Sequence, residues 1–125
     1  MGLQVLAVDD SRTIRDMLKM ALTQAGFEAR FAEDGVHGLE VLSGTMPDAI
    51  ITDINMPRLD GFGFIEAVRA QADYRATPIL VLTTESAPEL KAKARAAGAT
   101  GWIVKPFDPE KLVRALHTVA GPGAT

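Results

Sequence analysis

The stretch IITDINMPRLDG, residues 50–61, decides the fold, because it sets an apolar run directly against a carboxylate and a turn. The apolar residues at its start are typical of a buried strand, and the Pro, Asp and Gly residues at its end are typical of a loop. Asp53 stands at the boundary between the two. A buried strand that ends on a charged side chain needs a reason for that charge, so the rest of the chain must supply one.

Four further short apolar runs alternate with longer amphipathic stretches, a pattern that predicts parallel strands joined by helical crossovers. The second run carries Glu28 and Arg30 and is expected at an edge, whereas the other four lack polar alternation, as strands covered on both faces do. Right-handed crossovers give an open, doubly wound α/β sheet of (βα)5 type. The predicted strands are residues 3–8, 28–32, 48–52, 78–83 and 100–104.

Three of the intervening helices have clear signals. Residues 88–97 are alanine-rich and bury little apolar area, so this helix is expected to be loosely held and mobile. The last helix is expected to have Asp108 as its N-cap and Pro109 as its first residue, and to end at 121–122. Residues 11–25 form a helix that ends before a glycine, with an apolar stripe of Ile14, Met17, Leu18, Ala21, Leu22 and Ala25.

Length and composition restrict the class of protein. The 125 residues suit one domain, 1–125, with no output domain, and 47% apolar with 23% charged residues is typical of a globular chain. A net charge of −3 without a basic stripe argues against nucleic acid as the main ligand. The absence of Cys excludes disulfides and thiolate metal sites, and no apolar run could span a bilayer. A cytoplasmic location is expected.

Polar side chains follow four of the five predicted strands. Asp9 and Asp10 follow the first, Asp53 the third, Thr83 ends the fourth and Lys105 follows the fifth. In the flavodoxin-like strand order 2-1-3-4-5 these strands are neighbours, and ligands of such sheets bind beyond the carboxyl ends of the strands. The five side chains are therefore expected to share one pocket.

Three carboxylates in one pocket require a cation, and hard oxygen ligands suit Mg2+. With Lys105 and Thr83 beside them, they make a site suited to phosphoryl transfer, with Asp53 as the nucleophile that forms an acyl phosphate. Each residue taken alone has a simpler interpretation: Asp10 as a helix cap, Asp53 as a turn cap and Lys105 as a solvated cation. The joint pattern at one edge of the sheet favours the functional interpretation.

Other candidates have less support. His37 and His117 fall on different helices without a partner at ligand spacing, and both are expected at the surface. The GFGF stretch at 61–64 lacks the third glycine of a dinucleotide loop, and no P-loop is present. Ser43 and Ser86 have no histidine base within the pattern, so a hydrolase triad is unsupported.

The motifs VDDS, AEDG, DINMPRLDG, VLTTE and AGATGWIVKPF occur in this order along the chain. In this set the chain resembles response-regulator receiver domains, the single-domain CheY-like members in particular, from about Leu3 to Val119. The resemblance implies the order 2-1-3-4-5, on which the convergence at the strand ends partly depends. It also implies a phosphorylation-dependent switch of a two-component system that catalyses only its own phosphorylation and dephosphorylation.

Carried over residue by residue, the resemblance implies Asp53 as phosphoacceptor, Asp9 and Asp10 as further Mg2+ ligands, and Lys105 as the phosphate-contacting lysine, before a cis bond to Pro106. It also implies the following: Asn55 ligates the metal through its backbone carbonyl, Asn55 and Glu85 tune dephosphorylation, and Thr83 and Trp102 form the switch pair.

The switch aromatic of the family is usually Tyr or Phe. Trp102 therefore has a second interpretation, a half-buried amphipathic residue on an edge strand. Thr84 is larger than the residue often found there and could narrow access to the phosphate.

The resemblance implies a histidine kinase or histidine phosphotransfer protein as phosphoryl donor and a protein target, such as a flagellar motor switch protein in chemotaxis. A relay intermediate or phosphate sink is an alternative. A phosphatase with an Asp nucleophile is a further alternative. Such an enzyme needs a general acid where Asn55 stands, and an amide cannot supply the proton that the leaving group takes up. An FMN-binding protein is disfavoured because three acids would repel the FMN phosphate.

Overall fold

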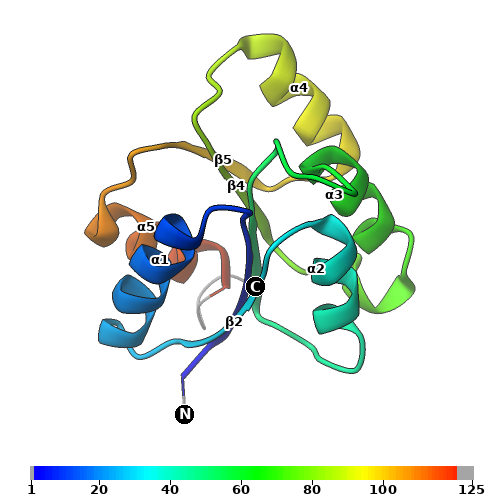
Figure 1. Ribbon diagram of the computed structural model, residues 1–125. Coiled ribbons are helices and arrows are strands. Elements are labelled where there is room, and N and C mark those ends of the chain that lie inside the picture. Colours follow the sequence, from blue (N-terminus) through cyan, green and yellow to red (C-terminus); the bar gives the residue numbers. More distant parts are fainter. Residues whose placement is uncertain (1, 121–125) are drawn as a thin grey trace.

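A computed structural model describes residues 2–120 and shows one parallel sheet between two layers of helices (Figure 1). The strand order is β2-β1-β3-β4-β5, so the predicted flavodoxin-like α/β fold is confirmed. The elements are β1 (Gln4–Val8), α1 (Arg12–Gln24), β2 (Glu28–Ala32), α2 (Gly35–Leu42), β3 (Ala49–Thr52), α3 (Gly61–Arg69), a short 3-10 turn η1 (Ala72–Tyr74), β4 (Ile79–Thr83), α4 (Pro88–Ala97), β5 (Gly101–Val104) and α5 (Pro109–Ala120).

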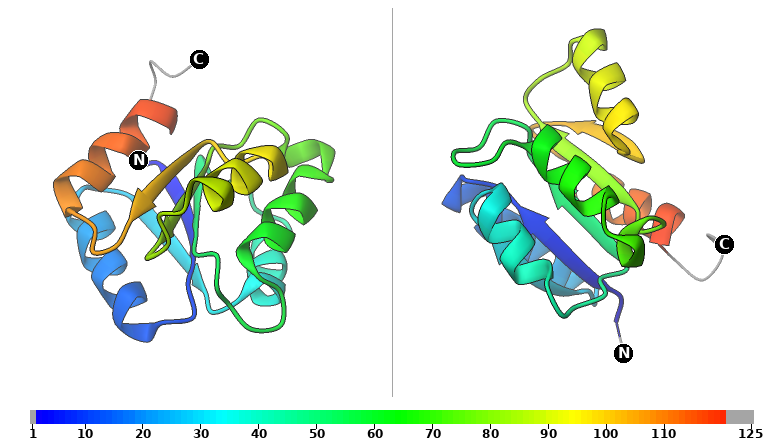
Figure 2. Two further views of the ribbon diagram at one scale, coloured as in Figure 1. Left: turned by 90° about the horizontal axis from the view of Figure 1, so that it is seen from above. Right: turned by 90° about the vertical axis from the view of Figure 1, so that its right-hand side faces the viewer.

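Each face of the sheet has its own apolar core. Helices α1 and α5 cover one face, and α2, α3 and α4 the other (Figure 2). On the first face Leu18, Leu22 and Leu116 are fully buried, and on the second Phe64 and Ile65 are. Burial of each such side chain contributes about 1.5–3 kcal/mol relative to exposure. The central strands β1, β3 and β4 are buried along most of their length, which holds their carboxyl ends rigidly side by side.

Side-chain caps start four of the described helices, and at α5 the predicted cap Asp108 accepts from the Glu110 N–H at 2.9 Å. The Ser11 hydroxyl accepts from the Ile14 N–H, the Asp34 carboxylate from the His37 N–H, and the Asp60 carboxylate from the Gly63 N–H. The N-cap of α1 is therefore Ser11 and not Asp10, and the acid that caps α3 is Asp60. The simple interpretation of Asp10 as a helix cap is wrong.

Two details of the predicted packing are also wrong. Met17 is 44% exposed, because the buried stripe of α1 consists of Leu18, Ala21 and Leu22 and Met17 lies to one side of it. Strand β5 is only partly buried, because it is the edge of the sheet opposite to β2. The predicted helix end at 121–122 lies outside the described residues.

Helix α4 is held by few contacts, as its alanine-rich sequence predicts. Ala94 is its one buried residue, and its N-cap, Ala87, makes no side-chain hydrogen bond. Its C-cap is Gly98, with φ of 119°, a conformation that favours glycine. The mobility expected of this helix stays a prediction.

The glycine in the middle of α2 has a packing reason that the sequence does not reveal. A Cβ atom at Gly38 would lie 2.8 Å from Cε1 of Phe64 and 3.1 Å from Cγ2 of Val8. Glycine lets α2 approach β1 and α3 closely, which offsets its low helix propensity. Across residues 2–120, none of the helices has the length and hydropathy to cross a bilayer.

Candidate functional site

Three carboxylates meet at the carboxyl ends of β1 and β3. Asp9 and Asp10 follow β1, Asp53 follows β3, and each offers an oxygen atom within 4.8 Å of the others. Asp9 and Asp53 are buried, whereas Asp10 is exposed. The three carboxylates therefore lie together at this edge of the sheet, as predicted. The cluster is open to solvent at Asp10.

Lys105 connects two of these carboxylates. Its Nζ donates to Oδ2 of Asp9 at 2.8 Å and to Oδ2 of Asp53 at 3.0 Å, and its side chain is only 10% exposed. Burial acts to lower the pKa of Lys105, but the hydrogen bonds to the two carboxylates raise it above its usual value. The lysine is therefore a charged, oriented donor rather than a solvated cation. Its peptide bond to Pro106 is cis, as the resemblance implied.

Asp9 is oriented by the start of α1. Its Oδ1 accepts from the Ser11 N–H at 2.9 Å, and its backbone carbonyl accepts from Nη1 of Arg15 at 2.7 Å. Burial raises the pKa of the Asp9 carboxyl, although the hydrogen bond from Lys105 acts in the opposite direction. Sequence analysis did not single out Arg15, because its contact is with the Asp9 backbone, six positions away, and no side-chain pattern marks it.

Asp53 is held by the neighbouring strand β1 and by the residues on either side of it. Its N–H donates to the Val8 carbonyl at 3.0 Å, which continues the β1–β3 ladder, and its Oδ1 accepts from the Ile54 N–H at 2.6 Å. The buried Thr52 hydroxyl donates to the Asp53 carbonyl at 2.8 Å. Oδ1 thus faces the following loop and Oδ2 faces Lys105, an arrangement that leaves the carboxylate one fixed orientation.

Thr83 and Trp102 are linked through one residue, Glu85. The Thr83 hydroxyl, fully buried at the end of β4, accepts from the Glu85 N–H at 3.4 Å, and the Glu85 carbonyl accepts from Nε1 of Trp102 at 3.0 Å. Trp102 is partly buried on β5 and packs against the core beneath α4. This matches its interpretation as a half-buried edge residue, and its role in a switch stays a prediction.

Asn55 lies in the loop after β3, two residues beyond Asp53, and it is exposed. Within residues 2–120 its side chain makes no hydrogen bond to the acids or to Lys105. The structure therefore places Asn55 beside the cluster without joining it to the network. Glu85 is partly buried, and its backbone rather than its carboxylate makes the contacts described above.

The donor set fits a divalent cation. Three carboxylates face a single ammonium group, and Lys105 reaches only two of them. The surplus of negative charge and the hard oxygen ligands suit Mg2+, which binds through one or two carboxylates and retains several waters. Asp9, Asp10 and Asp53 would hold it, and the exposed side of Asp10 gives water and ligand a path.

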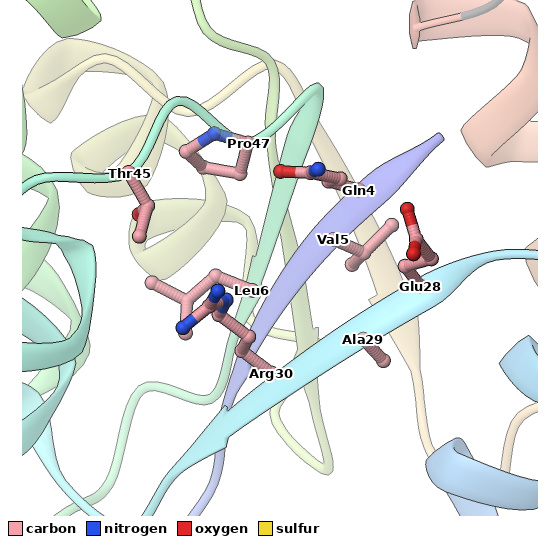
Figure 3. A pocket seen from close by; sticks show the side chains of 8 residues that line it. All are labelled: Gln4, Val5, Leu6, Glu28, Ala29, Arg30, Thr45 and Pro47. Carbon is pink, nitrogen blue, oxygen red and sulfur yellow. The ribbon is translucent and has the colours of Figure 1, made fainter. Parts of the chain in front are cut away.

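Elsewhere in residues 2–120 no second cluster of carboxylates and histidines comparable to this one occurs. His37 accepts from the Glu33 N–H through Nδ1 at 3.1 Å and is partly buried, so its predicted surface position is only partly correct. His117 is exposed, and its ring lies 5.1 Å from that of Phe27. A hollow of about 310 Å3 lies at the far end of the sheet, among residues of β1, β2 and the segment before β3 (Figure 3). It contains none of the predicted site residues.

Sequence analysis missed two arginine contacts, one in the loop beside the site and one at the opposite end of the sheet. Arg58, in the loop after β3, pairs with the buried Asp34, and Arg69 of α3 donates to the Gly98 carbonyl at the end of α4. Burial lowers the pKa of Arg69, whose guanidinium also donates to the Tyr74 carbonyl at 2.6 Å. Both contacts join residues more than 20 positions apart, so local patterns gave no sign of them.

Comparison with solved structures supports the same fold. The Vibrio cholerae chemotaxis protein CheY4 is 50% identical with a TM-score of 0.91, over 95% of this chain and 99% of that one. The receiver domain of the Pseudomonas aeruginosa sensor histidine kinase PA1611 has a magnesium ion coordinated in its active site cleft. It is 27% identical with a TM-score of 0.90, over 97% of this chain and 99% of that one.

Curated relatives differ in length. A probable chemotaxis protein CheY of Rhizobium etli is 37% identical over 120 residues, which are 95% of this chain and 93% of that protein. The chain spans about half the length of relatives named response regulator MprA from Mycobacterium. The response regulator receiver domain family matches residues 5–117. The chain therefore belongs to the response regulator receiver domain family.

Proposed function

We propose that Asp53 accepts a phosphoryl group from a phosphohistidine and that the modified domain signals by binding another protein. Receiver domains are the signalling switches of two-component systems, which supports this assignment. The observation that carries it is the position of Lys105 Nζ, bonded to both Asp9 and Asp53 at the edge where Thr83 also ends its strand.

The proposed step is an in-line displacement at phosphorus. The P–N bond of the phosphohistidine breaks as a P–O bond to Asp53 forms, and the imidazole nitrogen retains the electron pair of the broken bond and takes up a proton. Lys105 would balance the charge of the phosphoryl oxygens, and the Thr83 hydroxyl would donate to one of them. Asp53 is suited to attack because its carboxylate is already held in one orientation.

We propose Mg2+ as the cofactor, held by Asp9, Asp10 and Asp53 together with the backbone carbonyl of Asn55. When bound, the ion would supply a positive charge for phosphoryl oxygens that a single lysine cannot balance. The magnesium ion in the similar PA1611 receiver domain supports the choice of metal. The donor set described above supports it independently.

A phosphatase acting on an external phosphoester is the less favoured candidate. Such an enzyme would need an acid beside the nucleophile to protonate the leaving group. The residue in the corresponding place is Asn55, which is exposed and has no proton to give. Autophosphorylation and autodephosphorylation are therefore the proposed extent of its catalysis.

For the output we propose chemotaxis, in the cytoplasm, with a histidine kinase or histidine phosphotransfer protein as donor and a flagellar motor switch protein as target. The similarity to CheY4 of Vibrio cholerae and to the Rhizobium etli protein supports this choice. The MprA relatives, which are about twice as long, support response-regulator membership without the chemotaxis role. A relay intermediate or phosphate sink would show the same phosphorylation without a phosphorylation-dependent target.

The test is incubation with acetyl phosphate and Mg2+, measured as a mass gain of one phosphoryl group. We expect one acid-labile group on the wild type and none on Asp53→Asn. Asp60→Asn is the matched control, because asparagine also serves as an N-cap for α3. Label on Asp53→Asn would refute the assignment of the acceptor. Binding of the motor switch protein only to the phosphorylated chain would distinguish chemotaxis from a relay or sink.

A further inference from the structure

The loop between β3 and α3 contains a strained turn centred on Arg58. Its φ is 64°, and the Leu59 N–H donates to the Pro57 carbonyl at 2.7 Å. Residues 57–59 are thus a γ-turn with positive φ at its centre, which is rare and strained for a residue that has a Cβ atom. Among the described non-glycine residues, Arg58 is the one with positive φ. Such a conformation persists only where the surroundings hold it.

The side chain of the same residue supplies that hold. Nε of Arg58 donates to Oδ2 of Asp34 at 2.8 Å, and Nη2 donates to Oδ1 at 3.0 Å. The Asp34 side chain is 5% exposed, and the hydrogen bond from Arg58 lowers the pKa of its carboxyl. The backbone adds a second tie, because the Gly35 N–H donates to the Leu59 carbonyl at 3.1 Å. The turn is therefore attached to the start of α2 at two points.

Asn55 lies between this attachment and the phosphoacceptor strand. The loop is closed at its base by the Gly61 N–H, which donates to the Ile54 carbonyl at 2.8 Å, and the Ile54 N–H donates to Oδ1 of Asp53. The backbone from 54 to 59 is thus held at both ends, at Asp53 and at Asp34. Loss of the side-chain contact at the distal end would leave the exposed residues between them less restrained.

We propose that Arg58 and Asp34 are a positioning pair for the phosphoacceptor loop. The pair holds the loop in the conformation that presents the Asn55 carbonyl beside Asp53, and it thereby sets the Mg2+ dependence and the rate of phosphorylation. This inference rests on the proposed function of Asp53.

Helix α2 does not need the pair for its own cap. Oδ1 of Asp34 accepts from the His37 N–H at 2.8 Å, a hydrogen bond in which Arg58 takes no part. The guanidinium is half exposed, so its removal opens no cavity in the core. The consequence of losing Arg58 therefore falls on the loop rather than on the helix.

The test uses Arg58→Gly, Arg58→Ala, Asp34→Asn and the double variant Arg58→Ala/Asp34→Asn. Glycine adopts positive φ without strain, so Arg58→Gly removes the pair from a chain that still folds. Asn preserves the cap of α2. The matched control is Arg30→Ala, an exposed arginine on β2 for which the described structure shows no ion pair. The readouts are Mg2+ affinity, measured by calorimetric titration without a phosphoryl donor, and the phosphorylation rate with acetyl phosphate across a Mg2+ titration.

We expect each single variant to be phosphorylated about tenfold or more slowly at low Mg2+ and to need more Mg2+ for half-maximal rate, a loss typical of residues that orient metal ligands. The double variant should be no slower than Arg58→Ala alone. A wild-type rate and Mg2+ titration for Arg58→Gly or for Asp34→Asn, or losses that add in the double variant, would overturn the pair. Failure of the proposed function looks different, because the wild type would then take no label or Asp53→Asn would take it.

Discussion

The ammonium group of Lys105 lies 3.0 Å from Oδ2 of Asp53, across 52 positions of the chain. Its other hydrogen bond, to Asp9, makes it the shared cation of two buried carboxylates. Lys105 therefore neutralises two of the three carboxylates that would also hold a metal ion. Lys105 and Mg2+ are therefore expected to compete for these carboxylates.

In Lys105→Met, the increase in melting temperature on adding Mg2+ should be larger than in the wild type. The two carboxylates then lack their ammonium partner, so the metal relieves more repulsion and binds the folded state more tightly. The phosphorylation rate should fall by about a hundredfold, since one donor to the phosphoryl oxygens is lost. Thermal scans with and without Mg2+ check the first part and acetyl phosphate labelling the second. Equal thermal shifts in both proteins would refute the competition between lysine and metal.

Asp10→Asn should weaken Mg2+ binding by about tenfold or more without changing stability, because Asp10 is exposed but lies within the carboxylate cluster. Asp9→Asn should weaken Mg2+ binding and also reduce stability, since it removes a buried partner of Lys105. Calorimetric Mg2+ titration and chemical unfolding measure the two effects. Asp16→Asn, an exposed acid on α1, is the control. Unchanged Mg2+ affinity in both variants would count against the metal site.

Asn55→Lys should prolong the phosphoryl state. Asn55 is exposed two residues after Asp53, so a longer cationic side chain there can cover the phosphoryl group and exclude water. The measurement is the decay of label after the donor is removed, with Asn55→Gln as the control that adds length without charge. If Asn55→Lys loses its phosphoryl group as fast as the wild type, this mechanism of lifetime control is wrong.

Asp34 should contribute to stability in a manner that depends on pH. The hydrogen bond from Arg58 lowers its pKa, so its contribution is fully present above the unfolded value of about 3.9 and is lost as the pH falls through the lower folded value. The difference in unfolding free energy between wild type and Asp34→Asn should therefore be constant near neutral pH and shrink only below about pH 4. Urea unfolding across this range checks it. The same substitution in an Arg58→Ala background should show a weaker dependence, and a difference that grows on acidification would contradict the assignment.

Local sequence patterns predicted the strands, and the strand order implied by the family resemblance then predicted which residues meet at the edge of the sheet. The five strands were located to within a residue, since apolar runs and turn residues mark them directly. Lys105 was placed correctly because parallel strands bring their carboxyl ends together whatever the sequence distance. The Arg58–Asp34 pair was missed because the positive φ that aims Arg58 is a backbone property that the residue type does not reveal. Exposure of Met17 was missed because a helical stripe predicts a face but not its width.

The final prediction concerns the path from Thr83 to Trp102. In the unphosphorylated structure the Thr83 hydroxyl accepts from the Glu85 N–H, and the Glu85 carbonyl holds the Trp102 indole. A phosphoryl group on Asp53 would offer Thr83 a charge-assisted hydrogen bond, which is stronger than its long 3.4 Å contact with Glu85. Movement of Thr83 then releases the Glu85 backbone, and the indole loses its fixed acceptor.

We therefore expect the emission of Trp102, the single tryptophan of the chain, to change when phosphoryl donor and Mg2+ are added together. The change should be absent in Asp53→Asn, reduced in Thr83→Ala and retained in Thr83→Ser, which keeps the hydroxyl. A partner shifts the equilibrium between the unphosphorylated and phosphorylated conformations only by the difference in its affinity for them. A partner that prefers the phosphorylated form must therefore contact this region differently in each conformation. Emission that stays constant while the mass confirms phosphorylation would make Trp102 a static packing residue, and the signal would then leave the domain by another face.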